Sequence, residues 1–597
     1  MELVGEGRIY LINGPVVRAT GSQGFMMNEM VKVGKEGLIG EIVDIGEESF
    51  TVQVYENTTG LKVGEPIKGT GKLISAYLGP GLIGKIFDGI ERPLDRIALL
   101  YGDFVLRGIE MFPLDENKRW RVEMKKETGD TVQPGEVFAL VQETPLFEHR
   151  LLVPPHISGK VVEAKPSGDY KINDILLSVA DQRGNVHQLT MYQEWPIRIP
   201  RPAKERLLPV IPLITGQRVI DFFFPLAKGG AAAIPGGFGT GKTVTQHQLA
   251  KWSDADVVVY IGCGERGNEM SDVLEEFPRL VDPHTGRPLM ERTILIANTS
   301  NMPVSAREAS IYTGITIAEY FRDMGYNVAL MADSTSRWAE ALRELSGRME
   351  EMPAEEGYPA YLSSRLSEFY ERAGRVKTLA GKEGSVTIIG AVSPPGGDFS
   401  EPVTRHTREF VRCFWALDRN LAYSRHYPAI NWLTSYSDYS EDLRDWFQEN
   451  IGESWHTMRD QAMALLGEDD RLQQVIKLVG EDVLPDEHKL IVEVGRLIKI
   501  GFLQQNSFSS VDSFCSLQKQ FKMMELILFF YERAKELIIS GMAISEIKRS
   551  DIYLKLLRMR EEIPNDQLEK FDALKEEVEK FFDNLQVKYK EGAKSAD

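Results

Sequence analysis

A glycine-rich stretch with one lysine carries the strongest chemical signal in the sequence. Residues 235–243 read Pro-Gly-Gly-Phe-Gly-Thr-Gly-Lys-Thr, the pattern G-x-x-x-x-G-K-[ST]. Glycines let backbone N–H groups close around phosphate oxygens, because they have no Cβ and reach positive φ at little cost. The lysine can reach the β- and γ-phosphates, and the last threonine can ligate Mg²⁺. We therefore predict a loop that binds ATP or ADP through Gly236, Gly237, Phe238, Gly239, Thr240, Gly241, Lys242 and Thr243.

Two carboxylates are candidates for the chemistry that follows phosphate binding. Asp333 comes directly after the apolar run 328–332, and a carboxylate at the end of such a strand can help to hold Mg²⁺. Glu265 follows a different apolar run, near glycines, where it could orient or deprotonate an attacking water molecule. Taken alone, Glu265 reads better as a solvated glutamate in a turn. Asp333 gains weight from Lys242 and Thr243, because the three together form the pattern of a nucleotide site that binds Mg²⁺.

Arginines near these carboxylates carry weaker signals. Arg266 and Arg337 could neutralise charge on a transferred phosphoryl group, although a surface ion pair is an equally good interpretation of each. His406 and His426 are not at metal-ligand spacing, and no histidine stands beside Cys263 to make it a nucleophile. By pattern, Glu265, Lys242, Arg266 and Arg337 are candidates for catalysis, and Thr243 and Asp333 are candidates for metal binding.

Alternating strands and helices from about 196 to 440 would position these residues. This alternation is the pattern of a parallel sheet with right-handed crossovers. Apolar runs typical of strands buried on both faces occupy 231–234, 257–261, 293–297, 328–332 and 386–390. Polar residues follow these runs, and ligands of open α/β sheets bind outside the carboxyl ends of strands. We therefore expect the groups after the strands to converge on the bound phosphates.

The flanking regions have other patterns. Residues 1–75 contain short strands separated by glycines, as in a small antiparallel barrel, and residues 76–109 connect to the next domain. Residues 110–195 read as a β-rich insertion, with a lipoyl-type carrier domain as a weaker alternative. Residues 441–597 have helical apolar spacing. The amphipathic stretch 571–589 predicts a core-facing stripe on a terminal helix, and a contact with a moving partner is the sharper alternative.

The composition limits the function further. The chain has 597 residues, of which 43% are hydrophobic, and this length predicts three or more domains. Its net charge of −18 disfavours nucleic-acid binding, which needs clustered Lys and Arg. No apolar run approaches the ~20 residues that span a bilayer, and the N-terminus has no secretion signal. Three cysteines without paired spacing fit a reducing cytoplasm. Membrane work would have to go through partner subunits.

Taken together, these motifs resemble those of the catalytic A subunits of archaeal-type and vacuolar-type rotary ATPases, over nearly the whole chain. The runs that carry the resemblance are 236–243, 262–269, 297–303, 331–341, 392–398, 428–432 and 502–506. The β-rich segment 110–195 is also similar to the insertion that separates A subunits from the catalytic subunit of F-type enzymes.

The resemblance implies a multidomain α/β protein. Its parts would be an N-terminal β-barrel, a RecA-like P-loop domain with a β-rich insertion, and a C-terminal helical domain. ATP hydrolysis or synthesis would be coupled through a central shaft to H⁺ or Na⁺ transport by a membrane partner. Three such chains would alternate with three B subunits in a hexamer, and the B subunit would supply an arginine finger. The complex, with its peripheral stalk, would lie at the cytoplasmic face of a membrane.

The resemblance also assigns roles to single residues. Glu265 would be the catalytic carboxylate, and Arg337 falls where related ATPases place a phosphate-contacting arginine. Tyr427 and Phe508 fall where the family sandwiches adenine. Aromatic rings suit the face of a purine, and ordinary core packing is the alternative interpretation.

Two positions depart from the family pattern. Gly237 stands where the family usually has proline, which loosens the loop and could change how tightly ADP is held. Thr240 stands in place of the cysteine of many eukaryotic A subunits, which indicates a prokaryotic origin.

Three other functions remain as alternatives. A non-catalytic nucleotide-binding subunit is disfavoured because Lys242, Thr243, Glu265 and Asp333 are all present. A RecA-like nucleic-acid motor is disfavoured by the charge of −18. A secretion-system ATPase is nearer, but it would lack the segment at 110–195.

Overall fold

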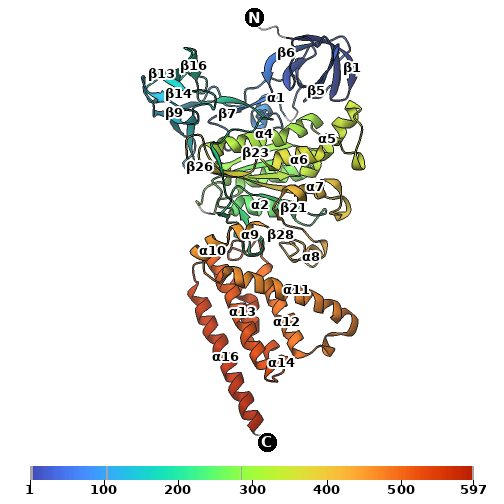
Figure 1. The fold of residues 1–597 in the computed structure, drawn as a ribbon, viewed down its shortest axis with the longest axis vertical. Coiled ribbons are helices and arrows are strands. Elements are labelled where there is room, and N and C mark those ends of the chain that lie inside the picture. The colour runs from blue at the N-terminus through green and yellow to red at the C-terminus, as the bar shows by residue number, and fades with distance from the viewer. Residues whose placement is uncertain (1–4, 103–104, 284, 595–597) are drawn as a thin grey trace. The chain divides into compact units, whose positions relative to one another are not determined.

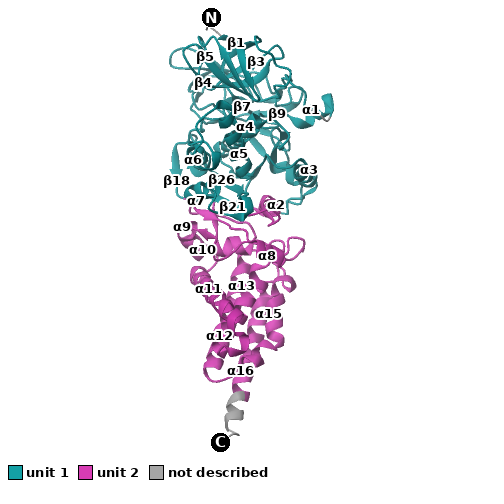
Figure 2. Ribbon diagram, turned by 90° about the vertical axis from the view of Figure 1, so that its right-hand side faces the viewer, with its two compact units in different colours: residues 1–208, 228–235, 255–411 teal, residues 209–227, 236–254, 412–597 magenta. Residues whose placement is uncertain are grey.

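The computed structural model describes residues 5–102, 105–283 and 285–594. The chain divides into two compact units, each assembled from distant parts of the sequence (Figure 2). Unit 1 consists of residues 1–208, 228–235 and 255–411, and unit 2 consists of residues 209–227, 236–254 and 412–597.

Unit 1 begins with a closed antiparallel barrel, dark blue in Figure 1. Its strands, in spatial order, are β1 (Glu6–Asn13), β2 (Val16–Thr20), β5 (Ser49–Val54), β4 (Leu38–Ile45), β3 (Glu29–Val33) and β6 (Pro66–Leu73). Val17, Val31, Val52 and Ile67 are fully buried in its core. Successive side chains of a strand point to opposite faces, so alternate residues fill the interior. The predicted N-terminal β-barrel is confirmed.

The β-rich insertion consists of two four-stranded sheets. One contains β10 (Thr131–Val132), β13 (Gly159–Ala164), β15 (Leu177–Ala180) and β16 (Val186–Leu189), and the other contains β12 (Glu148–Leu152), β11 (Val137–Gln142), β9 (Arg119–Met124) and β14 (Gly168–Lys171). A two-stranded ribbon of β7 (Ser75–Leu78) and β17 (Gln193–Pro196) joins the chain before the insertion to the chain after it.

A buried histidine connects the insertion to the rest of unit 1. His149 in β12 contacts the Glu143 carboxylate through Nδ1 at 2.8 Å and the Tyr320 hydroxyl through Nε2 at 2.9 Å. Tyr320 belongs to helix α4 (Val304–Asp323). Because polar groups of a buried side chain need partners, this chain of contacts fixes one end of the insertion on α4.

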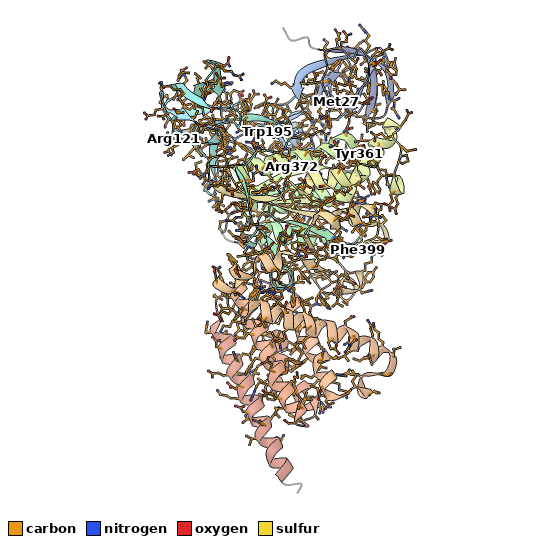
Figure 3. The ribbon with its side chains drawn as sticks, in the orientation of Figure 1. Met27, Arg121, Trp195, Tyr361, Arg372 and Phe399 are labelled. Carbon is orange, nitrogen blue, oxygen red and sulfur yellow. The ribbon has the colours of Figure 1, made fainter. Side chains whose placement is uncertain are left out.

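A parallel sheet forms the centre of unit 1. Its neighbouring strands are, in order, β21 (Ala231–Pro235), β26 (Glu383–Val392), β24 (Asn327–Asp333), β22 (Val257–Cys263), β23 (Thr293–Asn298) and β8 (Ile86–Phe87). Helix α4 packs on β22, β24, β26 and β23 and is buried along almost its whole length. Its buried Glu319 accepts hydrogen bonds from Arg372 at 3.0 and 2.6 Å, so the charges of both are compensated. Figure 3 labels Arg372 among the side chains of unit 1.

Further helices belong to unit 1, which is drawn in teal in Figure 2. They are α1 (Leu94–Tyr101), α3 (Gly267–Glu276), α5 (Thr335–Met349), α6 (Leu362–Tyr370) and α7 (Pro402–Phe410). The strands and helices alternate along the sequence as predicted, because the crossover between parallel strands needs a helix.

Unit 2 is mainly helical. Its helices are α2 (Lys242–Trp252), α8 (Arg419–Tyr423), α9 (Tyr439–Asp442), α10 (Arg444–Asn450), α11 (Trp455–Val479), α12 (Asp486–Arg496), α13 (Leu517–Ile539), α14 (Ile544–Lys548), α15 (Asp551–Glu562) and α16 (Glu569–Lys594). Phe571, Val578 and Phe582 of α16 are buried, and α16 packs on α13 and α15, which confirms the core-facing stripe. Among the described helices, none is long and apolar enough to cross a bilayer.

Candidate nucleotide-binding and catalytic site

The strand register in unit 1 brings the predicted acidic residues to one edge of the sheet. Pro235 at the end of β21 pairs with Val392 at the end of β26, and Asp333 at the end of β24 pairs with Gly262 in β22. All these strands are parallel, so their carboxyl ends lie at the same edge. The structure therefore places Asp333 and the loop that carries Glu265 together.

The loop that carries Glu265 is fixed by its backbone. The N–H of Gly264 donates to the carbonyl of Asn298 at 2.6 Å, and the N–H of Ser300 donates to the carbonyl of Glu265 at 2.9 Å. Gly264 has φ of +73°, and a Cβ at this position would lie 2.7 Å from Cβ of Arg337. Only glycine meets both conditions, so the Gly-Glu order holds the carboxylate in place.

Glu265 has a raised pKa of about 8. Burial disfavours its charge most strongly, and the nearby carboxylates of Asp333 and Glu269 disfavour it further, while Arg337 acts in the opposite direction. Asp333 is 2% exposed and accepts a hydrogen bond from the Tyr260 hydroxyl at 3.2 Å. Glu265 itself is only partly exposed, which disfavours the alternative of a solvated turn glutamate. The neighbouring carboxylates therefore favour the protonated form of Glu265.

The two predicted phosphate-contacting arginines have different surroundings. Nη1 of Arg337 contacts both carboxylate oxygens of Glu340 at 3.0 and 2.9 Å, one turn further along α5. Arg266 is exposed at the N-cap position of α3. Arg337 therefore forms an ion pair, which was one of the two interpretations of this residue in the sequence analysis. A role at phosphate stays a prediction for both residues.

The glycine-rich loop of unit 2 has the backbone that its sequence predicts. Gly239 and Gly241 have φ of +76° and +90°, a range that favours glycine, and α2 begins at Lys242. Nζ of Lys242 donates to the carbonyls of Gly236 at 2.7 Å and Gly237 at 3.1 Å. The loop therefore leads straight into a helix N-terminus, where backbone N–H groups and the helix dipole favour an anion.

A cavity of about 600 Å³ lies beside this loop within unit 2. Gly239, Gly241, Tyr427 and Phe508 are among the residues that line it. The exposed fractions of Tyr427 and Phe508 are 44% and 95%, so ordinary core packing is the wrong interpretation of both. Two accessible aromatic rings near a phosphate loop could bind the faces of a nucleotide base.

Other residues of this cavity were missed in the sequence. They include Gln217, Gln248, Arg425, Arg560 and Glu561. They come from separate stretches of the chain, and none belongs to a short pattern with a known mechanism. Only the fold brings them together, so no local signal could have found them.

The oxygen atoms of Thr243 and Asp333 are suitable ligands for a Mg²⁺ ion that is also bound to phosphate. Among the described residues, no group of three or more His, Cys, Asp or Glu side chains is placed to hold a metal ion. Mg²⁺ usually keeps several water ligands and binds one or two carboxylates together with the phosphates of a substrate. A hydroxyl from Thr243 and a carboxylate from Asp333 are oxygen ligands of the kind that this ion prefers.

Comparisons with known proteins agree with this arrangement of domains. The model of the ATP synthase alpha/beta family nucleotide-binding domain matches residues 216–437. The family's beta-barrel domain matches 9–71, its barrel-sandwich domain 111–198, and the C-terminal domain of V and A type ATP synthase 444–548. The V-type ATP synthase alpha chain of Halothermothrix orenii is 61% identical over 98% of this chain and 100% of its own length. The chain belongs to this family of V- and A-type ATP synthase subunits.

Further relatives of this family come from bacteria and archaea. The V-type ATP synthase alpha chain 2 of Clostridium tetani is 57% identical, with 98% of each chain covered. The A subunit of the A-type ATP synthase of Methanopyrus kandleri is 58% identical over 97% of this chain and 98% of its own. The ATPase EscN of the enteropathogenic E. coli type III secretion system has a TM-score of 0.62 and 21% identity, over 87% of this chain and 100% of its own. That likeness shows the shared fold.

Proposed function

We propose that this chain is the catalytic subunit of a V/A-type ATP synthase, which hydrolyses or makes ATP. The proposal rests on the two carboxylate side chains that lie at the edge of the sheet. Glu265 and Asp333 lie there together, and the pKa of Glu265 is raised to about 8 by burial and neighbouring carboxylates. A base whose pKa lies near the working pH suits proton transfer from water. The high identity to named ATP synthase subunits supports the same function.

The proposal assigns the base and the phosphates of the nucleotide to residues of unit 2. The base lies between Tyr427 and Phe508, and the phosphates lie on the loop from Gly236 to Thr243. The exposed rings of Tyr427 and Phe508 and the positive φ of Gly239 and Gly241 support this assignment.

The residues would divide the chemistry as follows. Thr243 and Asp333 would hold Mg²⁺, which when bound supplies positive charge that offsets the charge of the phosphates. Glu265 would orient the attacking water and accept its proton. Lys242 and Arg266 would contact phosphate oxygens, and Arg337 would exchange its contact with Glu340 for the transferred phosphoryl group.

Partner subunits complete the proposal. A B subunit would alternate with this chain in a hexamer of three copies each and supply an arginine finger. A central shaft and peripheral stalk subunits would join this hexamer to a membrane sector that carries H⁺ or Na⁺ at the cytoplasmic face. The names of the relatives support membership in such a multi-subunit synthase.

A reconstitution with a point variant tests the function. ATP hydrolysis is measured for the chain alone and with its B partner, as wild type and as Glu265→Gln. Turnover should appear mainly in the mixture, and the variant should lose about 100-fold or more of kcat while still binding ATP. Glu275→Gln is the matched control, since Glu275 is an exposed glutamate of the adjacent helix α3.

Two outcomes would contradict the proposal. Normal turnover by Glu265→Gln would leave the chain as a nucleotide-binding subunit without catalysis. Tight, salt-sensitive binding of RNA would instead favour a nucleic-acid motor.

A further inference from the structure

A guanidinium group lies directly against the glycine-rich loop of unit 2. A Cβ built on Gly237 would lie 2.7 Å from Nε and from Nη2 of Arg419, and 3.1 Å from its Cζ. Gly237 is buried, whereas Phe238 and Gly239 that follow it are exposed. The φ of Gly237 is not among the positive values of the loop. Its backbone does not require glycine, so the missing side chain instead makes room for the guanidinium.

The backbone that carries Arg419 is well anchored. Arg419 is the first residue of α8, and the preceding Asp418 caps this helix by accepting hydrogen bonds from the N–H groups of Asn420 and Leu421. The other oxygen of Asp418 accepts a hydrogen bond from Nδ2 of Asn431 at 2.9 Å. A fixed backbone limits where the side chain can reach, so its position on Gly237 follows from the local fold.

Two cations contact the same loop residue. Nζ of Lys242 donates to the carbonyl of Gly237 at 3.1 Å, and the guanidinium of Arg419 lies against its Cα. Within the described part of the chain, the Arg419 side chain forms no hydrogen bond or ion pair. Like charges in one place repel unless an anion lies with them. The loop already has the geometry of an anion site.

We propose that Arg419 is a phosphate-contacting residue of the nucleotide site and that Gly237 is the residue that admits it. The planar fork of a guanidinium matches two phosphate oxygens at once, which a lysine cannot do. A residue with a side chain at position 237, including the proline usual in the family, would occupy the place of this group. The inference rests on the proposed function, since the ligand is the polyphosphate of ATP or ADP.

Calorimetric binding of ATP, ADP and AMP to the full-length chain tests the pair. The variants are Arg419→Ala, Arg419→Lys, Gly237→Ala and the double variant Gly237→Ala/Arg419→Ala. Arg549→Ala is the matched control, because Arg549 is another exposed arginine of unit 2 and lies at the end of α14. Thermal unfolding of each variant checks that it is folded. If Arg419→Ala does not fold, Arg419→Lys and Gly237→Ala decide.

We expect Arg419→Ala to weaken ATP and ADP binding about tenfold, the size of one charge-assisted hydrogen bond, and AMP binding less. Arg419→Lys should recover part of this loss. Gly237→Ala should weaken binding in the wild-type background and add little to Arg419→Ala, because both changes remove the same contact. The control should bind as wild type does.

Three results would overturn the inference. They are an unchanged ATP affinity in Arg419→Ala, an equal loss of AMP affinity in that variant, and full additivity of the two substitutions. If wild type binds ATP and Arg419→Ala binds it equally well, only the role of Arg419 fails. If wild type binds no ATP, the proposed function fails and this inference fails with it.

Discussion

The acidic sheet edge of unit 1 and the glycine-rich loop of unit 2 are built in opposite ways. The sheet edge of unit 1 is acidic and covered: Asp333 is 2% exposed, and Glu265 is held by a loop with backbone hydrogen bonds on both sides. The loop and cavity of unit 2 are open and carry exposed rings, with Phe238 77% and Phe508 95% exposed. Buried strands fix the sheet edge of unit 1, whereas turns and loops form the glycine-rich loop and the cavity of unit 2.

Because of this difference, we expect unit 1 to determine the rate of the chemical step and unit 2 to determine the affinity for the nucleotide. A buried carboxylate with a raised pKa contributes little to binding, but it can move a proton once a cation and a water molecule are present. Exposed rings and cationic groups contribute contact area and charge, and so they set how tightly a nucleotide is held. Substitutions in unit 1 should therefore change turnover more than affinity, and those in unit 2 should change affinity first.

Lys242→Ala should have the largest effect and break this division. Lys242 belongs to unit 2, but its charge would act on the phosphates that react, so both affinity and turnover should fall. We expect kcat to fall about 100-fold or more, as for loss of one group that stabilises transition-state charge. Steady-state hydrolysis and ATP binding in the reconstituted complex measure both. Lys251→Ala at the far end of α2 is the control, and a normal kcat in Lys242→Ala would contradict the expectation.

Phe508→Ala should lower the affinity for ATP, as expected for a residue of unit 2. Stacking of a base on an aromatic ring contributes about 1–3 kcal/mol, so ATP affinity should fall roughly 5- to 150-fold. Inorganic tripolyphosphate has no base, and its affinity should stay the same. Stability should hardly change because the ring is 95% exposed. Tyr423→Ala removes another exposed ring of unit 2 and serves as control. An equal loss for tripolyphosphate would show that Phe508 does not contact the base.

The pH dependence of turnover tests the sheet edge in unit 1. The base form of Glu265 increases as pH rises through its pKa of about 8, so the acidic limb of kcat/KM should report this group. Glu269→Gln removes one of the charges that raise this pKa, so the limb should move to lower pH by up to about one unit. Glu275→Gln should leave it in place. A limb that moves to higher pH in Glu269→Gln would contradict the assignment.

The smallest expected effect is on stability. Glu265 holds its proton in the native chain up to a pKa of about 8 but loses it near 4.5 when unfolded, so stability falls as pH rises between these values. Glu265→Gln does not titrate. Its free energy of unfolding relative to wild type should therefore increase from pH 5 to pH 8, on the order of 1 kcal/mol. Thermal or denaturant unfolding at several pH values measures this, and a constant difference would contradict it.

The central sheet could be predicted from the sequence because its strands are continuous apolar runs. Residues 257–261 and 328–332 need both faces covered, which a parallel sheet provides. The same reasoning placed Asp333 at a strand end, and the spacing of Gly236 to Thr243 fixed the loop. These signals are local, so a single sequence carries them in full.

The remaining features depend on contacts between distant residues. Nothing near Glu265 in the sequence indicates that Asp333 would raise its pKa, and taken alone it resembled a solvated glutamate. Arg419 carries no motif, and its contact with Gly237 arises only after α8 is in place. Arg560 lines the cavity from a helix near the end of the chain. Such contacts are decided by tertiary packing, which no window of sequence contains.

The ribbon of β7 and β17 has a consequence for how this architecture can vary. Paired strands lie about 4.8 Å apart, so the ribbon brings Leu78 and Gln193 together. The chain between them also supplies β8 to the central sheet and the helix α1, so only the part beyond α1 could be exchanged without removing a strand of this sheet. Such an exchange would leave the Tyr320 hydroxyl without the imidazole that now satisfies it, and Phe321 without its ring contact to Phe147.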